Sequence, residues 1–101
     1  MHKHTIKYPN HLYRLRKNRG LSQKSLAHLL GHRSVRMLSR YETGVALPPL
    51  KTALLLQIAL GAHVSDMYPG AFRDLELQAT MRTTQLTPTL GRRIRDRLER
   101  G

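Results

Sequence analysis

Arg36 and Arg40 are the residues of this chain whose type and spacing point most directly to a chemical task. On a helix that turns about 100° per residue, the two guanidinium groups fall within about 40° of each other. Leu38 and Tyr41 fall on the opposite side, where they would form a buried edge. A guanidinium matches the O6 and N7 acceptors of guanine, and an α-helix fits the major groove of B-DNA. This outer face therefore suits base recognition, and the alternative is an ordinary solvated helix face.

The segments around these arginines predict two short helices joined by a tight turn. The first is expected over Gln23–Leu30, and the second spans 34–43, including its cap. Gly31 opens the turn "GHRS", because it can adopt the left-handed backbone that reverses the chain. Two short helices joined in this way are the signature of a helix-turn-helix motif. A helix of two turns is not stable alone, so other helices must hold its apolar edge.

The rest of the chain also contains residues that start and stop helices at frequent intervals, as expected of a helical protein. No alternating strand pattern exceeds a few residues. The predicted helix starts are Asn10, Ser22, Ser34, Pro48–Pro49 and Ser65. The predicted helix stops are Gly20, Gly31, Gly44 and Gly61. A further helix is expected over 71–82, followed by the polar stretch "TTQLTPT". The expected fold is all-α, with five short helices and a C-terminal helical extension.

The predicted elements divide the chain into three parts. Residues 1–9 are expected to be a flexible basic arm, 10–69 a helix-turn-helix DNA-binding domain, and 70–101 a C-terminal helical extension with a basic tail. In that tail, "GRRIRDRLER" surrounds Ile94 and Leu98 with arginines. The tail is either a solubilising, frayed end or an extension that follows DNA phosphates.

The composition and net charge indicate which class of molecule the chain binds. The chain has 101 residues, no cysteine and a formal net charge of +12, which draws it to polyanions. Nucleic acid is favoured over an anionic membrane surface. The N-terminal stretch has no apolar signal region, and no apolar run is long enough to span a membrane. We therefore expect a cytoplasmic protein with no membrane partner.

The segment "LYRLRKNRGLSQKSLAHLLG…SVRMLSRYETG…LPPLKTALLLQIALGAHVSDMYP" resembles the lambda-repressor-like (Cro/XRE) helix-turn-helix family. The match runs over Leu12–Tyr68, more than half of the chain. Its motifs are specific in combination, and each alone would be weak. They are Leu21-Ser22-Gln23, Leu26-Ala27, Ser39 to Gly44, Pro48 and Leu60-Gly61. The resemblance implies a five-helix domain that docks one helix in the major groove.

The resemblance also implies roles for individual residues. The base-reading positions are Val35, Arg36, Ser39 and Arg40. The phosphate-contacting positions are Ser22, Gln23, Lys24, Ser34 and Thr43. Arg16 and Glu42 match a structural ion pair that ties the first helix to the end of the recognition helix.

Two departures from the family pattern bear on these roles. The span from Gly31 to Gly44 is one residue longer than usual, with the extra residue near His32-Arg33. If that residue lay inside the recognition helix, the base-reading set would shift by one position. The loop "GVALPP" also lacks Lys and Arg, where many relatives place basic phosphate contacts. The residues that could compensate are Lys3, Lys7, Lys17 and Lys24.

The fourth helix, "LKTALLLQIALG", is apolar nearly all round, which predicts burial on both faces. Leu50, Ala53, Leu56 and Leu60 are expected to face the domain core. Leu55 and Ile58 fall on the far side, where Phe72, Leu75 and Met81 of the same chain or a second subunit could cover them. We expect the 71–82 helix to pack on the domain and to help form a homodimer, with an interface made by Leu55, Ile58, Phe72 and Leu75.

No catalytic constellation stands out, because none of the six histidines pairs with a carboxylate at a useful spacing. We expect no enzyme activity, no cofactor and no metal site. Three functions compete. The first is a sequence-specific double-stranded DNA-binding transcriptional regulator, most often a repressor in this family. The second is an antitoxin-like protein that binds a partner protein through its extension and autoregulates its operon. The third is a basic binder of RNA or anionic lipid.

Overall fold

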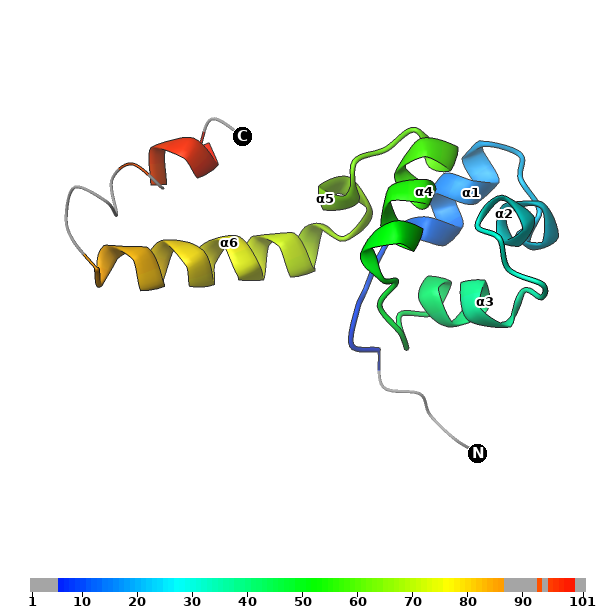
Figure 1. Cartoon of the computed structure of the whole chain (residues 1–101), viewed down its shortest axis with the longest axis horizontal. Coiled ribbons are helices and arrows are strands. Elements are labelled where there is room, and N and C mark those ends of the chain that lie inside the picture. Colours follow the sequence, from blue (N-terminus) through cyan, green and yellow to red (C-terminus); the bar gives the residue numbers. More distant parts are fainter. Residues whose placement is uncertain (1–5, 87–92, 94, 100–101) are drawn as a thin grey trace. The chain divides into compact units, whose positions relative to one another are not determined.

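The computed structural model describes residues 6–86, 93 and 95–99, and these residues contain helices and no strand (Figure 1). The all-α prediction is therefore confirmed. Residue 93 and the stretch 95–99 are also helical. The named helices are α1 (Leu12–Asn18), α2 (Gln23–Leu29), α3 (Arg36–Glu42), α4 (Leu50–Leu60), α5 (Val64–Met67) and α6 (Pro69–Thr84). The chain divides into a unit of residues 1–70 and a unit of residues 71–101, and each is described by itself.

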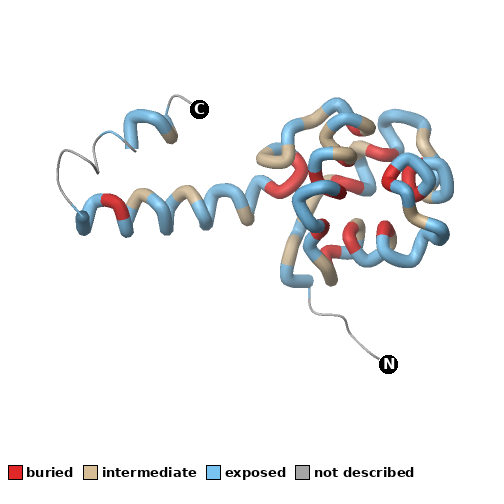
Figure 2. Tube along the Cα trace, viewed as in Figure 1, coloured by how far each residue is buried: buried red, intermediate tan, exposed pale blue. Residues whose placement is uncertain are grey.

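The core of the first unit takes one fully buried large apolar side chain from each of its helices. These side chains are Leu12, Leu26, Leu38, Leu56 and Met67. Each such burial contributes about 1.5–3 kcal/mol. In Figure 2 the buried positions of α1 to α5 gather at the centre of this unit. Each helix is too short to persist alone, so this shared core holds all five in place.

The helix starts follow the sequence prediction at α2 and α4 and depart from it at α1, α3 and α5. The N-cap of α4 is Pro49, as expected, whereas the N-cap of α3 is Val35 and not Ser34. Ser22 caps α2 as expected, because its hydroxyl oxygen accepts from the Ser25 amide at 3.0 Å. The N-cap of α1 is His11 and not Asn10, and the N-cap of α5 is His63 and not Ser65. Neither histidine makes a side-chain cap hydrogen bond, so no local capping signal marks these two starts.

Asn10 has a bracing role in place of the predicted cap. Its Oδ1 accepts from the Leu12 amide at 2.9 Å, and its Nδ2 donates to the carbonyl oxygens of Tyr8 and Tyr41 at 2.9 and 2.8 Å. Asn10 thus ties the chain before α1 to the last turn of α3.

The prediction for Leu50 is wrong, since its side chain is 75% exposed. Thr52 is buried, together with Ala53, Leu56 and Leu60. The buried face of α4 is therefore rotated away from Leu50 by the way α4 meets α2 and α5.

Helix α6 lies mostly in the second unit, and it is longer than the predicted 71–82 helix at both ends. It begins at Pro69, because proline has no amide hydrogen to lose in a first turn. It continues to Thr84, and the hydroxyls of Thr80, Thr83 and Thr84 donate to carbonyl oxygens of the preceding turn. The rest of the polar stretch, and Ile94 of the tail, lie outside the described residues. None of the described helices has the length and apolar character needed to cross a bilayer.

Candidate nucleic-acid interface

The outer face of α3 presents two exposed guanidinium groups. Leu38 and Tyr41 are 0% and 3% exposed and hold the inner face of α3 against the core. Arg36 and Arg40 are exposed, and neither side chain has a hydrogen-bond or ion-pair partner among the described residues. A ligand could therefore engage both groups without first breaking a contact inside the protein.

The remaining predicted base-reading positions differ from one another. Val35 is the N-cap of α3 and is 38% exposed, whereas Ser39 is half-buried and its carbonyl oxygen accepts from Thr43. Met37, which the sequence analysis left out of the set, is as exposed as Val35. Met37 lies between the buried and the outer face of α3. Helical periodicity alone therefore does not tell whether other residues cover it, and the tertiary structure shows that they do not.

The extra residue of the turn lies before α3 and not inside it. The Gly31 and His32 amides donate to carbonyl oxygens of α2, at His28 and Ala27, and helix α3 begins only at Arg36. The His32 ring packs against Tyr41, with ring centroids 6.3 Å apart. This contact places the turn residue His32 beside the buried side of α3.

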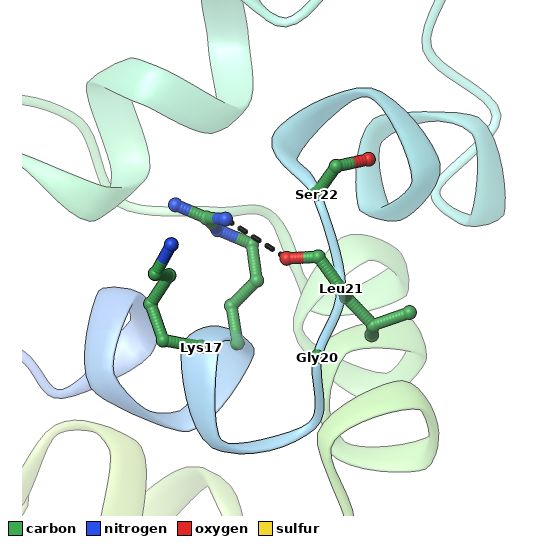
Figure 3. Close-up of a pocket in the computed structure, with 5 residues that line it drawn as sticks. Lys17, Gly20, Leu21 and Ser22 are labelled. Carbon is green, nitrogen blue, oxygen red and sulfur yellow. Dashed lines mark hydrogen bonds between the residues drawn. The ribbon is translucent and has the colours of Figure 1, made fainter.

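Glu42 is the centre of a network that joins the first three helices. Its Oε2 accepts from Arg16 Nε at 2.6 Å, and its Oε1 accepts from Arg16 Nη2 at 3.2 Å and from Gln23 Nε2 at 3.0 Å. The Arg16 and Glu42 side chains are 7% and 4% exposed. Arg16 Nη1 also donates to the Leu21 carbonyl oxygen at 2.9 Å, the bond dashed in Figure 3. The network fixes α3 relative to α1 and the start of α2.

Gln23 is half-buried, and its bond to Glu42 is an interaction that the sequence analysis missed. That bond directs the amide nitrogen of Gln23 toward the protein. A DNA contact by Gln23 would therefore use its remaining N–H or its carbonyl oxygen. Since the two residues are 19 positions apart, only the tertiary fold brings them together.

The start of α2 gathers polar and basic groups that face solvent. Lys24 is exposed, and the hydroxyl oxygens of Ser22 and Ser25 lie 2.9 Å apart. A cleft between the end of α1 and the start of α2 is lined by Arg16, Lys17, Gly20, Leu21 and Ser22 (Figure 3). The structure thus places Lys17 on the same opening as Ser22.

The hydroxyls flanking α3 are engaged to different extents. Ser34 is exposed, and its Oγ lies 3.4 Å from the Arg36 amide nitrogen, too far for a strong cap. The Thr43 hydroxyl faces the carbonyl oxygens of Ser39 and Arg40 at 2.9 and 3.3 Å. Its hydrogen is thus turned back toward the helix, and Thr43 would have to release these carbonyls before donating to a phosphate.

The residues predicted for an interface lie on surfaces of their own units. Leu55 is half-buried, whereas Ile58, Phe72 and Leu75 are 77%, 49% and 63% exposed. Leu50 and Leu54, which the prediction did not include, are also exposed on α4. Together with Ile58 they recur every fourth residue, so they share one face.

Charge in the first unit is strongly one-sided. Residues 1–70 hold 11 Lys and Arg against two acidic side chains, Glu42 and Asp66. Glu42 is buried with Arg16, so it offers little compensation to the exposed arginines of α3. A surface of this sign attracts a polyanion and favours rapid association with it.

Comparison with known proteins agrees with this arrangement. A protein-family model described as "Helix-turn-helix" matches residues 12–67, which span α1 to α5. No curated protein and no solved structure gave a match.

Proposed function

The chain belongs to the Cro/C1-type helix-turn-helix family of DNA-binding transcription regulators, and we propose that it is a sequence-specific repressor. It would act by occupying promoter DNA, with α3 in the major groove. The observation that carries this proposal is the pair of exposed guanidinium groups of Arg36 and Arg40, which have no partner among the described residues, on a helix fixed by its opposite face.

In this proposal Arg36, Arg40 and Val35 contact base edges, with Ser39 at the margin because it is half-buried. Bidentate arginine contacts discriminate guanine from other bases by about 1–3 kcal/mol each. The phosphate backbone is contacted or bordered by five further residues, Lys24, Ser22, Ser34, Gln23 and Thr43. Arg16 and Glu42 position α3 and do not touch DNA.

The experiment that tests the proposal is selection from a random duplex library with the wild-type chain, with Arg36→Ala and with a control, Arg14→Ala, on α1. Recovery of a defined sequence by the wild type and the control, and loss of preference at one or two positions with Arg36→Ala, would support base reading. Equal weakening of Arg36→Ala on selected and random duplexes would make Arg36 a phosphate contact. Failure of the wild type to enrich any sequence would reject the proposal.

We further propose that the chain binds DNA as a homodimer. A single domain of this kind reads only a few base pairs, and two-fold dimers bind half-sites about 34 Å apart. The support within the chain is exposed apolar surface on two helices. On α4 it comprises Leu50, Leu54 and Ile58, with Leu55 half-buried beside them, and on α6 it includes Phe72 and Leu75. A recovered palindrome in the duplex selection would support this symmetry.

The antitoxin-like function remains the second candidate, and the apolar side chains of α6 favour it. Phe72, Leu75, Leu77 and Met81 are each 49% or more exposed. Such side chains suit a partner protein as well as a second copy of this chain. If Phe72→Glu leaves the dimer mass unchanged while a co-expressed neighbouring gene product no longer co-purifies, α6 serves a partner protein.

A further inference from the structure

The described part of the N-terminal arm is anchored beside the end of α3. The amides of Lys7 and Tyr8 both donate to the Gly44 carbonyl oxygen, at 3.1 and 3.0 Å. The Tyr8 carbonyl oxygen accepts from Asn10 Nδ2, which also donates to the Tyr41 carbonyl oxygen. This differs from the expectation of flexibility over the whole of residues 1–9, since residues 6–8 are held on the helical domain.

Gly44 makes this close approach possible. Its φ is +78°, and a Cβ atom at this position would lie 2.8 Å from the Tyr8 carbonyl oxygen and 2.9 Å from Ile6 Cγ2. Any larger residue would push the arm away. Gly31 has nearly the same φ, +79°, but a Cβ there would meet nothing within 4 Å. The glycine at position 44 therefore serves the docking of the arm in addition to the turn.

The docked arm places a lysine, Lys7, next to a loop that has no positively charged residue. The loop from Gly44 to Pro49 contains no Lys or Arg, whereas Lys7 is exposed and hydrogen-bonded through its backbone to the first residue of that loop. The nearest acidic residue along α3 is Glu42, which is buried with Arg16. The Lys7 ammonium group consequently has no acidic partner among the described residues. The Lys7 backbone lies beside Gly44, just after the end of α3 that carries Arg40.

From this placement we propose that Lys7 contacts a backbone phosphate of the duplex that α3 reads, and that docking of the arm on Gly44 holds it there. The inference rests on the proposed DNA-binding function and deepens it. The ligand is a DNA phosphate. A lysine supplies a point charge to it and carries no base preference.

The first test compares Lys7→Gln with Lys51→Gln, which removes another exposed lysine, on α4. Affinity for the selected duplex is measured by fluorescence anisotropy over a range of salt concentrations. Loss of one phosphate contact reduces the slope of log K against log salt by about 1. We expect that reduction for Lys7→Gln, equal on selected and random duplexes, and a smaller change for Lys51→Gln. Equal slopes for the two variants would overturn the proposal.

The second test asks whether the docking matters, by repeating Lys7→Gln in Gly44→Ala and Gly31→Ala backgrounds. Both backgrounds carry the same strain of a left-handed alanine, but only Gly44→Ala displaces the arm. The effect of Lys7→Gln should vanish in Gly44→Ala and persist in Gly31→Ala. An undiminished effect in both would refute anchorage at Gly44. If Gly44→Ala fails to fold by circular dichroism, the comparison of Lys7→Gln with Lys51→Gln still decides the phosphate contact.

Failure of this inference is distinguishable from failure of the proposed function. A wild-type chain that selects a defined duplex, with no slope change for Lys7→Gln, would refute only the role of Lys7. A wild-type chain that binds all duplexes alike would refute sequence-specific repression, while the slopes of the two lysine variants on random duplex would still report on Lys7.

Discussion

At the residue scale, two buried polar side chains of the first unit are treated in opposite ways. Glu42 has three hydrogen bonds to Arg16 and Gln23, so its charge is compensated at close range. The Tyr68 hydroxyl is buried and has no hydrogen-bond partner among the described residues. Burial of the ring, and secondarily the nearby Tyr41, raise the pKa of Tyr68 well above its ordinary value. These two residues therefore predict opposite responses to removal.

Glu42→Ala is expected to destabilise the protein by about 3–5 kcal/mol, because it leaves the Arg16 guanidinium buried without its partner. Urea denaturation followed by circular dichroism measures the change. Asp66→Ala, which removes an exposed carboxylate from α5, is the control and should cost much less. Similar losses in the two variants would show that the Arg16–Glu42 pair contributes little.

Tyr68→Phe is expected to leave stability at neutral pH unchanged or to raise it by up to about 1 kcal/mol, because it removes an unsatisfied buried hydroxyl. The raised pKa means that the phenol ionises more readily in the unfolded chain. The contribution of the Tyr68 phenol to the free energy of unfolding is therefore complete below the unfolded-state pKa of about 10. It declines as pH rises above that value. Denaturation midpoints across that range should fall less steeply for Tyr68→Phe than for wild type.

The control for this alkaline dependence is Tyr13→Phe, which alters an exposed phenol. It should keep the wild-type dependence on pH. If Tyr68→Phe loses stability at neutral pH, its hydroxyl has a partner in solution and the assignment is wrong.

At the element scale, α3 exists because the rest of the fold holds it. It is a seven-residue helix, and its N-cap Val35 makes no side-chain cap hydrogen bond. Intrinsic propensity is too weak to maintain such a helix in water. Its position comes from Leu38 and Tyr41 in the core and from the Glu42 network at its last turn.

Leu38→Ala should therefore cost about 2–5 kcal/mol, since it opens a cavity at a fully buried site. Met37→Ala, one residue earlier on the exposed side of the same helix, should cost about 1 kcal/mol or less. Urea midpoints of the two variants make the comparison. A smaller loss for Leu38→Ala than for Met37→Ala would contradict the packing described for α3.

At the scale of the whole molecule, the exposed apolar face of α4 is the surface that we expect to be buried in a dimer. Leu50, Leu54 and Ile58 are 75%, 48% and 77% exposed and share one face of the helix. Monomeric soluble proteins seldom expose large contiguous apolar patches. Leu55, which the sequence analysis placed in the interface, is half-buried and would be a poorer test than Ile58.

Ile58→Lys is expected to convert a dimer to a monomer, as measured by light scattering, with little change in the denaturation midpoint. The affinity for a palindromic duplex should fall by at least tenfold, while affinity for a single half-site should stay within about twofold, because the second half-site contributes only to a dimer. Lys51→Gln, at an exposed position seven residues earlier on α4, is the control. A dimeric Ile58→Lys with intact palindrome binding would exclude this face of α4 from the interface.

The sequence by itself determined the helical class, the helix-turn-helix segment, the cap at Ser22 and the outward arginines of α3. These features depend on local periodicity, turn residues and capping, which a short window of sequence contains. Tertiary structure alone decided the anchorage of residues 6–8 on Gly44, the bond of Gln23 to Glu42, the bracing role of Asn10 and the exposure of Leu50. Each of these depends on which segments the shared core brings together, and residues far apart in the chain carry no local signal of that meeting.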